Sequence, residues 1–135
     1  MIELTYNGAT VTVPANNDVP FNAVMKSGCA ERYEANTNTL TLVKAGRYLV
    51  SASANIAVPT GGVVGPVTLG IASNGSIING TTMAATPTVA GAFFNVATQT
   101  YVDVYPCSSK TIALRAGIAP VDVNNQNLTA VRVNG

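Results

Sequence analysis

The sequence predicts an all-β protein, a sandwich or jelly roll of two sheets with about ten antiparallel strands. Its short segments are rich in Val, Ile and Thr and alternate between apolar and polar residues, which is the two-residue period of a half-buried strand. Gly, Pro and Asn interrupt these segments at short intervals, as turns between strands require. No segment of ten or more residues shows a helical period. The length of 135 residues suits one domain spanning residues 1–135.

The beginning of the chain predicts an N-terminal hairpin or arm over residues 1–13. Apolar and polar residues alternate on both sides of Asn7-Gly8. A two-residue Asn-Gly loop favours a type I′ turn, because the twist of that turn matches the twist of paired strands. The resulting register pairs Leu4 with Val11 on the buried face.

Further strands are expected along the rest of the chain. They cover residues 40–57 with a break at residues 44–46, then 66–71, 76–78, 92–105, 111–118 and 128–133. A second Asn-Gly turn, Asn74-Gly75, joins two of these strands. In the long segment, one phase of the alternation predicts core residues: Leu40, Leu42, Tyr48, Val50, Ala52, Ala54 and Ile56.

The composition argues against several functions. The net charge is +1, and the seven Lys and Arg residues form no run, so we expect no nucleic-acid partner. No apolar stretch reaches about 18 residues, so we expect no membrane span. The chain begins Met1-Ile2-Glu3 without a basic and then apolar leader, which argues against a signal peptide.

We also expect no enzyme, no cofactor and no metal site. Histidine, the commonest general base and a common metal ligand, is absent. Cys29 and Cys107 therefore have no histidine partner for nucleophilic catalysis, and their separation matches no metal-binding spacing. Asp103 and Asp122 are candidate calcium ligands, but they belong to no evident cluster of oxygens. For the two cysteines the sequence leaves open a disulfide or two free thiols, and the missing leader favours thiols.

The most unusual feature is an uncharged span, because no charged residue lies between Arg47 and Asp103. Monomeric domains usually place charges on the solvent face of antiparallel strands. Here the residues that alternate with the core are small and neutral: Ser51, Ser53, Asn55, Asn95, Ala97 and Gln99. Since the centres of protein interfaces are depleted in charge, we expect one sheet face to be buried in an oligomer. The alternative is a neutral exposed surface rich in Ser, Asn and Thr.

Several short motifs occur in a familiar order. Residues 40–52 contain an apolar strand, then Gly46-Arg47-Tyr48, then a long central strand, and this run resembles the signature of the C1q/tumour-necrosis-factor superfamily. Other segments are similar to further strands of that family: Val19-Pro20-Phe21, residues 67–75, residues 102–114 and the closing strand at 128–133. The resemblance covers about residues 9–134 and depends on the order and spacing of the motifs.

This resemblance implies a ten-stranded jelly roll that forms a homotrimer about the outer face of its inner sheet. The residues alternating with Tyr48 and Val50 would then face the threefold axis. The implied trimer interface consists of Leu49, Ser51, Ser53, Asn95, Ala97, Gln99 and Tyr101. Axis positions in the family are often aromatic, whereas here only Tyr101 is, which predicts a wetter centre with bridging water.

The short chain without leader or stalk is similar to stand-alone C1q-like proteins of Firmicutes and their bacteriophages. That resemblance implies a non-enzymatic trimeric structural protein on the virion surface, a capsid decoration or head fibre, with a capsid or other virion protein as its partner. Attachment would use one end of the sandwich or the N-terminal arm, and the hairpin at residues 2–13 is the favoured segment. The alternative is a receptor- or carbohydrate-binding head on a phage or bacterial surface, and the alternative locations are the bacterial cell surface and the cytoplasm.

Overall fold

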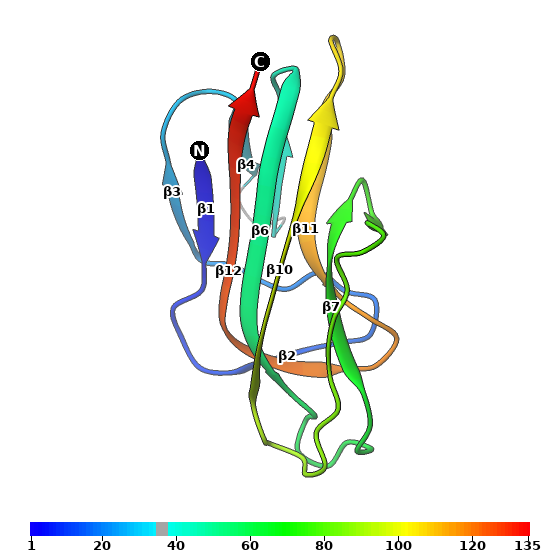
Figure 1. Cartoon of the computed structure of the whole chain (residues 1–135). Helices are drawn as coiled ribbons and strands as arrows, with labels where there is room; N and C mark the ends of the chain where they lie inside the picture. Colours follow the sequence, from blue (N-terminus) through cyan, green and yellow to red (C-terminus); the bar gives the residue numbers. More distant parts are fainter. Residues whose placement is uncertain (35–37) are drawn as a thin grey trace.

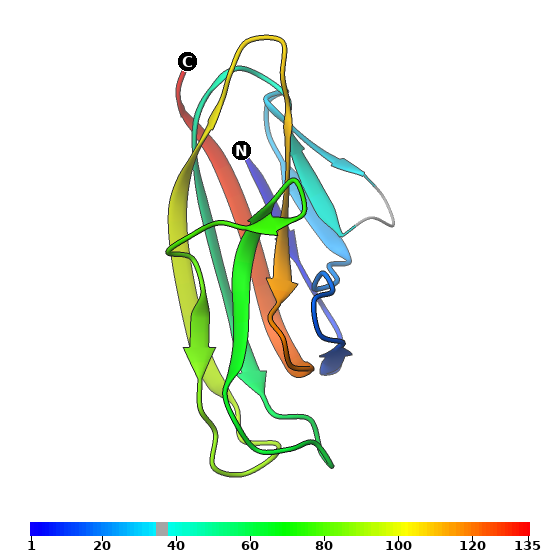
Figure 2. The ribbon, with the colours of Figure 1, turned by 90° about the vertical axis from the view of Figure 1, so that its right-hand side faces the viewer.

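The computed structural model describes residues 1–34 and 38–135 as two antiparallel sheets that form a β sandwich (Figures 1 and 2), which confirms the predicted all-β class. The first sheet has the order β10 (Phe94–Val104), β6 (Gly46–Ala57), β12 (Val121–Asn134), β1 (Ile2–Thr5) and β3 (Ala23–Lys26), and β2 (Val11–Val13) also pairs with β12. The second sheet has the order β4 (Glu31–Glu34), β5 (Thr39–Leu42), β11 (Lys110–Ala116), β7 (Val67–Ser73) and β8 (Ser76–Ile77), and β9 (Met83–Ala85) also pairs with β7. The described residues form no helix of the length and apolar character needed to cross a membrane.

Alternation along β6 supplies the centre of the core. Every core residue predicted between positions 40 and 57 is buried, with at most 4% of its surface exposed. These residues join buried residues of both sheets, including Leu128 of β12 and Leu114 of β11, in one hydrophobic cluster. The residues between them along β6, such as Ser51 and Ser53, are only half-buried. The inner face of the first sheet is therefore apolar and its outer face is polar.

The sandwich is elongated along its strands and has two distinct ends (Figure 1). The upper end, toward which both termini lie, holds the turn before β6 and the loops at residues 27–30 and 105–109. The lower end holds the loops at residues 58–66, 86–93 and 117–120.

The predicted N-terminal hairpin is wrong. β1 lies between β12 and β3, so both of its edges are already paired and Leu4 lies opposite Leu128 and Val24 instead of Val11. β2 pairs with the start of β12. A type I′ turn needs two residues with positive φ, and at Asn7-Gly8 only the glycine has one. Residues 1–13 are thus built into the first sheet and form no free arm.

The second Asn-Gly turn is confirmed. Asn74 and Gly75 have φ values of 51° and 88°, as a type I′ turn requires, and Ser73 of β7 lies opposite Ser76 of β8. Asn74 also accepts a hydrogen bond at its Oδ1 from the backbone N–H of Thr111, 2.9 Å away. That contact ties the turn to the start of β11.

The last strand is longer than predicted. β12 begins at Val121, although the sequence predicts a strand only from residue 128. A bulge explains the difference: the pairing with β6 shifts between Asn124 and Asn127, and Asn125 has a φ of 52°. This extra residue breaks the two-residue period on which the prediction depends. It also turns Gln126 inward, where it is 1% exposed and donates from Nε2 to the carbonyl of Pro20 at 3.0 Å.

Candidate assembly face

The seven predicted interface residues lie on one face of two neighbouring strands. β10 and β6 pair along their length, and their outward residues form five pairs: Asp103 with Arg47, Tyr101 with Leu49, Gln99 with Ser51, Ala97 with Ser53, and Asn95 with Asn55. The residues between them include Val102 and Val50, which are buried in the core. We call the surface formed by these pairs and by the outward residues of β12 and β1 the outer face of the first sheet.

β12 contributes residues to this face that the prediction did not include. Val131 lies opposite Leu49, Thr129 opposite Ser51, and Asn127 opposite Ser53. Thr129 and Val131 keep the two-residue period of the closing strand, so the sequence contained the signal for them. Asn127 keeps the same phase, but it lies one residue before the predicted start of that strand and was therefore not included.

The outer face is apolar near the upper end and polar below. Tyr101, Leu49 and Val131 form one apolar row across three strands, and Tyr101 is 60% exposed. The lower rows consist of serine, threonine, glutamine and asparagine with Ala97. A partner surface on this face would therefore meet an apolar strip followed by neutral polar groups.

Several polar groups on the face remain available for a partner. Within the described chain, the hydroxyls of Ser51 and Ser53 and the side-chain amide of Gln99 have no hydrogen-bond partner. They border a shallow hollow of about 350 Å³ between β10, β6 and β12. Groups in such a position can bond to water or to side chains across an interface.

The charged residues of the outer face lie away from its middle. Arg47, at the upper edge, donates from Nε to Oδ1 of Asp103 at 2.8 Å and from Nη2 to Oδ2 at 3.1 Å. The hydrogen bond from Arg47 lowers the pKa of Asp103, and the guanidinium carbon lies 5.6 Å from the centre of the Tyr101 ring. On β1, Glu3 accepts a hydrogen bond from the amide of Asn127 at 2.7 Å. The middle of the face, across β10, β6 and β12, has no charged side chain.

The loops of the lower end form a second neutral surface. A groove of about 470 Å³ lies between the loops at 58–66 and 117–120, and its lining includes Val58, Pro59 and Pro120. Beside it, Val63 is 96% exposed and Ile118 is 93% exposed. No charged residue occurs in either loop. These two loops can be desolvated without burying an unpaired charge.

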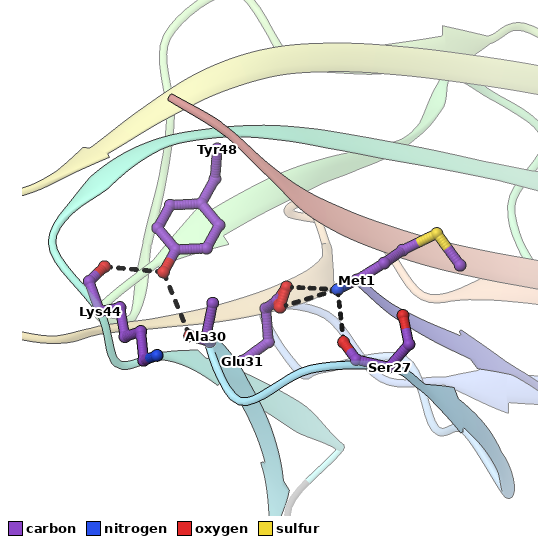
Figure 3. A network of polar contacts seen from close by, with 6 residues as sticks. All are labelled: Met1, Ser27, Ala30, Glu31, Lys44 and Tyr48. Carbon is purple, nitrogen blue, oxygen red and sulfur yellow. Dashed lines mark hydrogen bonds and ion pairs between the residues drawn. The ribbon is translucent and has the colours of Figure 1, made fainter. Parts of the chain in front are cut away.

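The upper end is held by a network of polar contacts (Figure 3). The amino group of Met1 donates to the carbonyl of Ser27 at 2.8 Å and to Oε2 of Glu31 at 3.1 Å, and the Glu31 side chain is fully buried. Oε1 of Glu31 lies 2.8 Å from the same ammonium, in a direction that gives an ion pair without a well-aligned hydrogen bond. The ion pair thus fixes the buried Glu31 carboxylate on edge strand β4.

The structure separates the other candidate site residues. Asp103 lies opposite Arg47 near the upper end of β6, whereas Asp122 lies opposite Ala57 at the lower end and accepts a hydrogen bond from Thr12. They form no common calcium site. Cys29 and Cys107 are free, exposed thiols in two loops of the upper end.

Comparisons with protein families and with curated proteins identify no relative. No protein-family model matches the chain, and no curated protein matches it at a significant level. Functional inference therefore depends on the residues and on the fold.

Proposed function

We propose that this chain is a non-enzymatic structural protein that assembles as a homotrimer through the outer face of the first sheet, in a jelly roll of the C1q/tumour-necrosis-factor type. The neutrality of the middle of that face, across β10, β6 and β12, is the observation that supports the proposal. Burial of this part would cover the apolar row of Tyr101, Leu49 and Val131 without desolvating an unpaired charge. The number of copies, three, comes from the family resemblance.

The proposed location is the surface of a bacteriophage virion, as a capsid decoration or head fibre. It follows from the resemblance to short stand-alone members of the family. The lower end supports attachment there, because exposed Val63 and Ile118 flank an apolar groove. It replaces the N-terminal segment as the attachment surface, since β1 is fixed inside the first sheet.

The molar mass in solution tests the assembly. Light scattering of the eluted protein should give three times the 13.8 kDa chain mass. Ala97→Arg places an unpaired charge in the buried face, at a cost of about 3–5 kcal/mol, and should shift the mass toward that of one chain. Ser76→Arg is the matched control, because Ser76 is exposed at a turn of the second sheet. Wild-type protein that elutes as a monomer at micromolar concentration would refute the trimer.

Attachment can be tested on particles. Antibody against the protein should label the surface of virions of the bacteriophage that encodes it. Ile118→Asp should reduce binding to particles that lack the protein, because the charge would be desolvated in the contact, while the trimer persists. Ser76→Asp should bind like wild type. Unlabelled virions would exclude the virion location, and unchanged binding of Ile118→Asp would exclude the lower end.

A further inference from the structure

Two exposed thiols lie at the same end of the sandwich but next to opposite edges of the first sheet. Cys29 follows β3, the strand at one edge, and Cys107 follows β10, the strand at the other edge. Both loops belong to the upper end, because Lys26 pairs beside Ile2 and Ser27 bonds to Met1, while Val104 pairs with Gly46. The fold therefore places one thiol above each edge of the proposed assembly sheet.

The distance across one sheet works against pairing within a chain. Four strand spacings separate β3 from β10 in the first sheet, which is about 19 Å at about 4.8 Å per spacing. In the second sheet two spacings, about 10 Å, separate β4, which follows the Cys29 loop, from β11, which follows the Cys107 loop. A disulfide needs Cα atoms about 4.4–6.8 Å apart. Both cysteines are free in the single chain.

A closed ring of copies brings the opposite edges together. In a cyclic assembly each copy presents one edge to one neighbour and the other edge to the second neighbour. If the outer face of the first sheet faces the axis along its full length, the axis runs parallel to the strands and all upper ends lie on the same side. The β10 edge of one copy then meets the β3 edge of the next.

We propose that Cys107 of one protomer and Cys29 of its neighbour form an intersubunit disulfide that closes the trimer covalently. The proposal rests on the trimer proposed above. The proposed trimer requires only non-covalent contacts. The disulfides would add three identical covalent bonds per ring.

Cys107 is exposed at the third position of a turn in the loop at residues 105–109. The backbone N–H of Ser108 donates to the carbonyl of Tyr105 at 3.2 Å, Pro106 is the second residue of the turn, and Cys107 has a φ of 64°. Glycine or asparagine is usual at such a third position, since other residues adopt positive φ only with strain. Cysteine holds the position here and is exposed.

The bond forms by thiol–disulfide exchange with a small disulfide, for which oxidised glutathione is the probe. The thiolate of Cys107 attacks one sulfur of glutathione disulfide and releases one glutathione thiolate, which leaves a mixed disulfide. The thiolate of the neighbour's Cys29 then attacks the Cys107 sulfur and releases the second glutathione. Two protein thiols lose two electrons and two protons, and one glutathione disulfide is reduced to two thiols.

Denaturing electrophoresis without reductant tests the pairing on trimer verified by light scattering. Oxidised wild-type protein should run at up to three chain masses and return to one chain mass after reduction. Cys29→Ser and Cys107→Ser, each alone, should remain at one chain mass. Co-expressed together, the two variants should give two chain masses and never three, since a mixed ring contains only one complementary contact.

Other outcomes overturn the proposal. A trimer whose oxidised chains stay at one chain mass excludes the intersubunit bond and leaves the trimer intact. Covalent dimers of Cys29→Ser alone would show pairing between two Cys107 residues. A single-chain mass in light scattering would remove both the trimer and the bond.

Discussion

Tyr48 links two segments of the upper end at the scale of a single residue. It is fully buried, and its hydroxyl donates to the carbonyl of Lys44 at 2.7 Å and lies 3.1 Å from the carbonyl of Ala30 (Figure 3). The first contact closes the turn before β6, and the second holds the loop before β4. The alternation of apolar and polar residues predicts that Tyr48 lies in the core. It does not predict the hydrogen-bond partners of the hydroxyl, which belong to two separate loops.

Tyr48→Phe should lower the free energy of unfolding by about 1–2 kcal/mol at pH 8, because the carbonyl of Lys44 loses its donor, whereas that of Ala30 keeps the N–H of Val43. Burial raises the pKa of Tyr48 above its ordinary value near 10. Above about pH 10 the folded chain then holds more protons than the unfolded chain, so wild-type stability, fully present below that pH, falls as the pH rises.

Urea denaturation of wild type and Tyr48→Phe between pH 8 and 11 measures both effects. The stability of the variant should fall less steeply with pH than that of the wild type. Tyr105→Phe, at an exposed position, should change neither the stability nor the slope. Parallel slopes for wild type and Tyr48→Phe would show that Tyr48 does not titrate in this range.

At the scale of elements, the two Asn-Gly pairs show what local sequence can predict. Both predict a type I′ turn, and only Asn74-Gly75 forms one. The first fails because β1 gains two neighbours from distant parts of the chain, β12 and β3, which no local pattern reveals. The same limit applies at Asn125, where a bulge ends the alternation of β12. Long apolar alternation, as in β6, is predicted well because burial on one face determines it.

Gly75→Ala should destabilise the chain by about 1 kcal/mol, because alanine adopts a φ of 88° only with strain. A Cβ at this position meets nothing within 4 Å, so no clash contributes. Gly65→Ala is the matched control: its Cβ also meets nothing, and its φ is not positive. Thermal unfolding of both variants measures the difference, and an equal loss of stability would contradict a turn with left-handed residues.

At the scale of the whole molecule, charge is unevenly distributed. The unpaired lysines Lys26, Lys44 and Lys110 lie toward the upper end, whereas the lower loops and the middle of the outer face are neutral. The sequence shows the uncharged span, and the register of β10, β6 and β12 places much of it on one face. This distribution leaves two surfaces that can be buried, one for assembly along the strands and one for attachment at the lower end.

The most direct test of the central claim is the solvent accessibility of the outer face. Ala97→Cys, in a chain carrying Cys29→Ser and Cys107→Ser, places one small thiol in the middle of that face, and Ser76→Cys places one on the second sheet. The rate of labelling by a maleimide should be about tenfold or more slower at position 97 than at position 76 at high protein concentration, and should rise on dilution. Equal labelling rates at the two positions at every concentration would show that the outer face is exposed and that the proposed assembly is wrong.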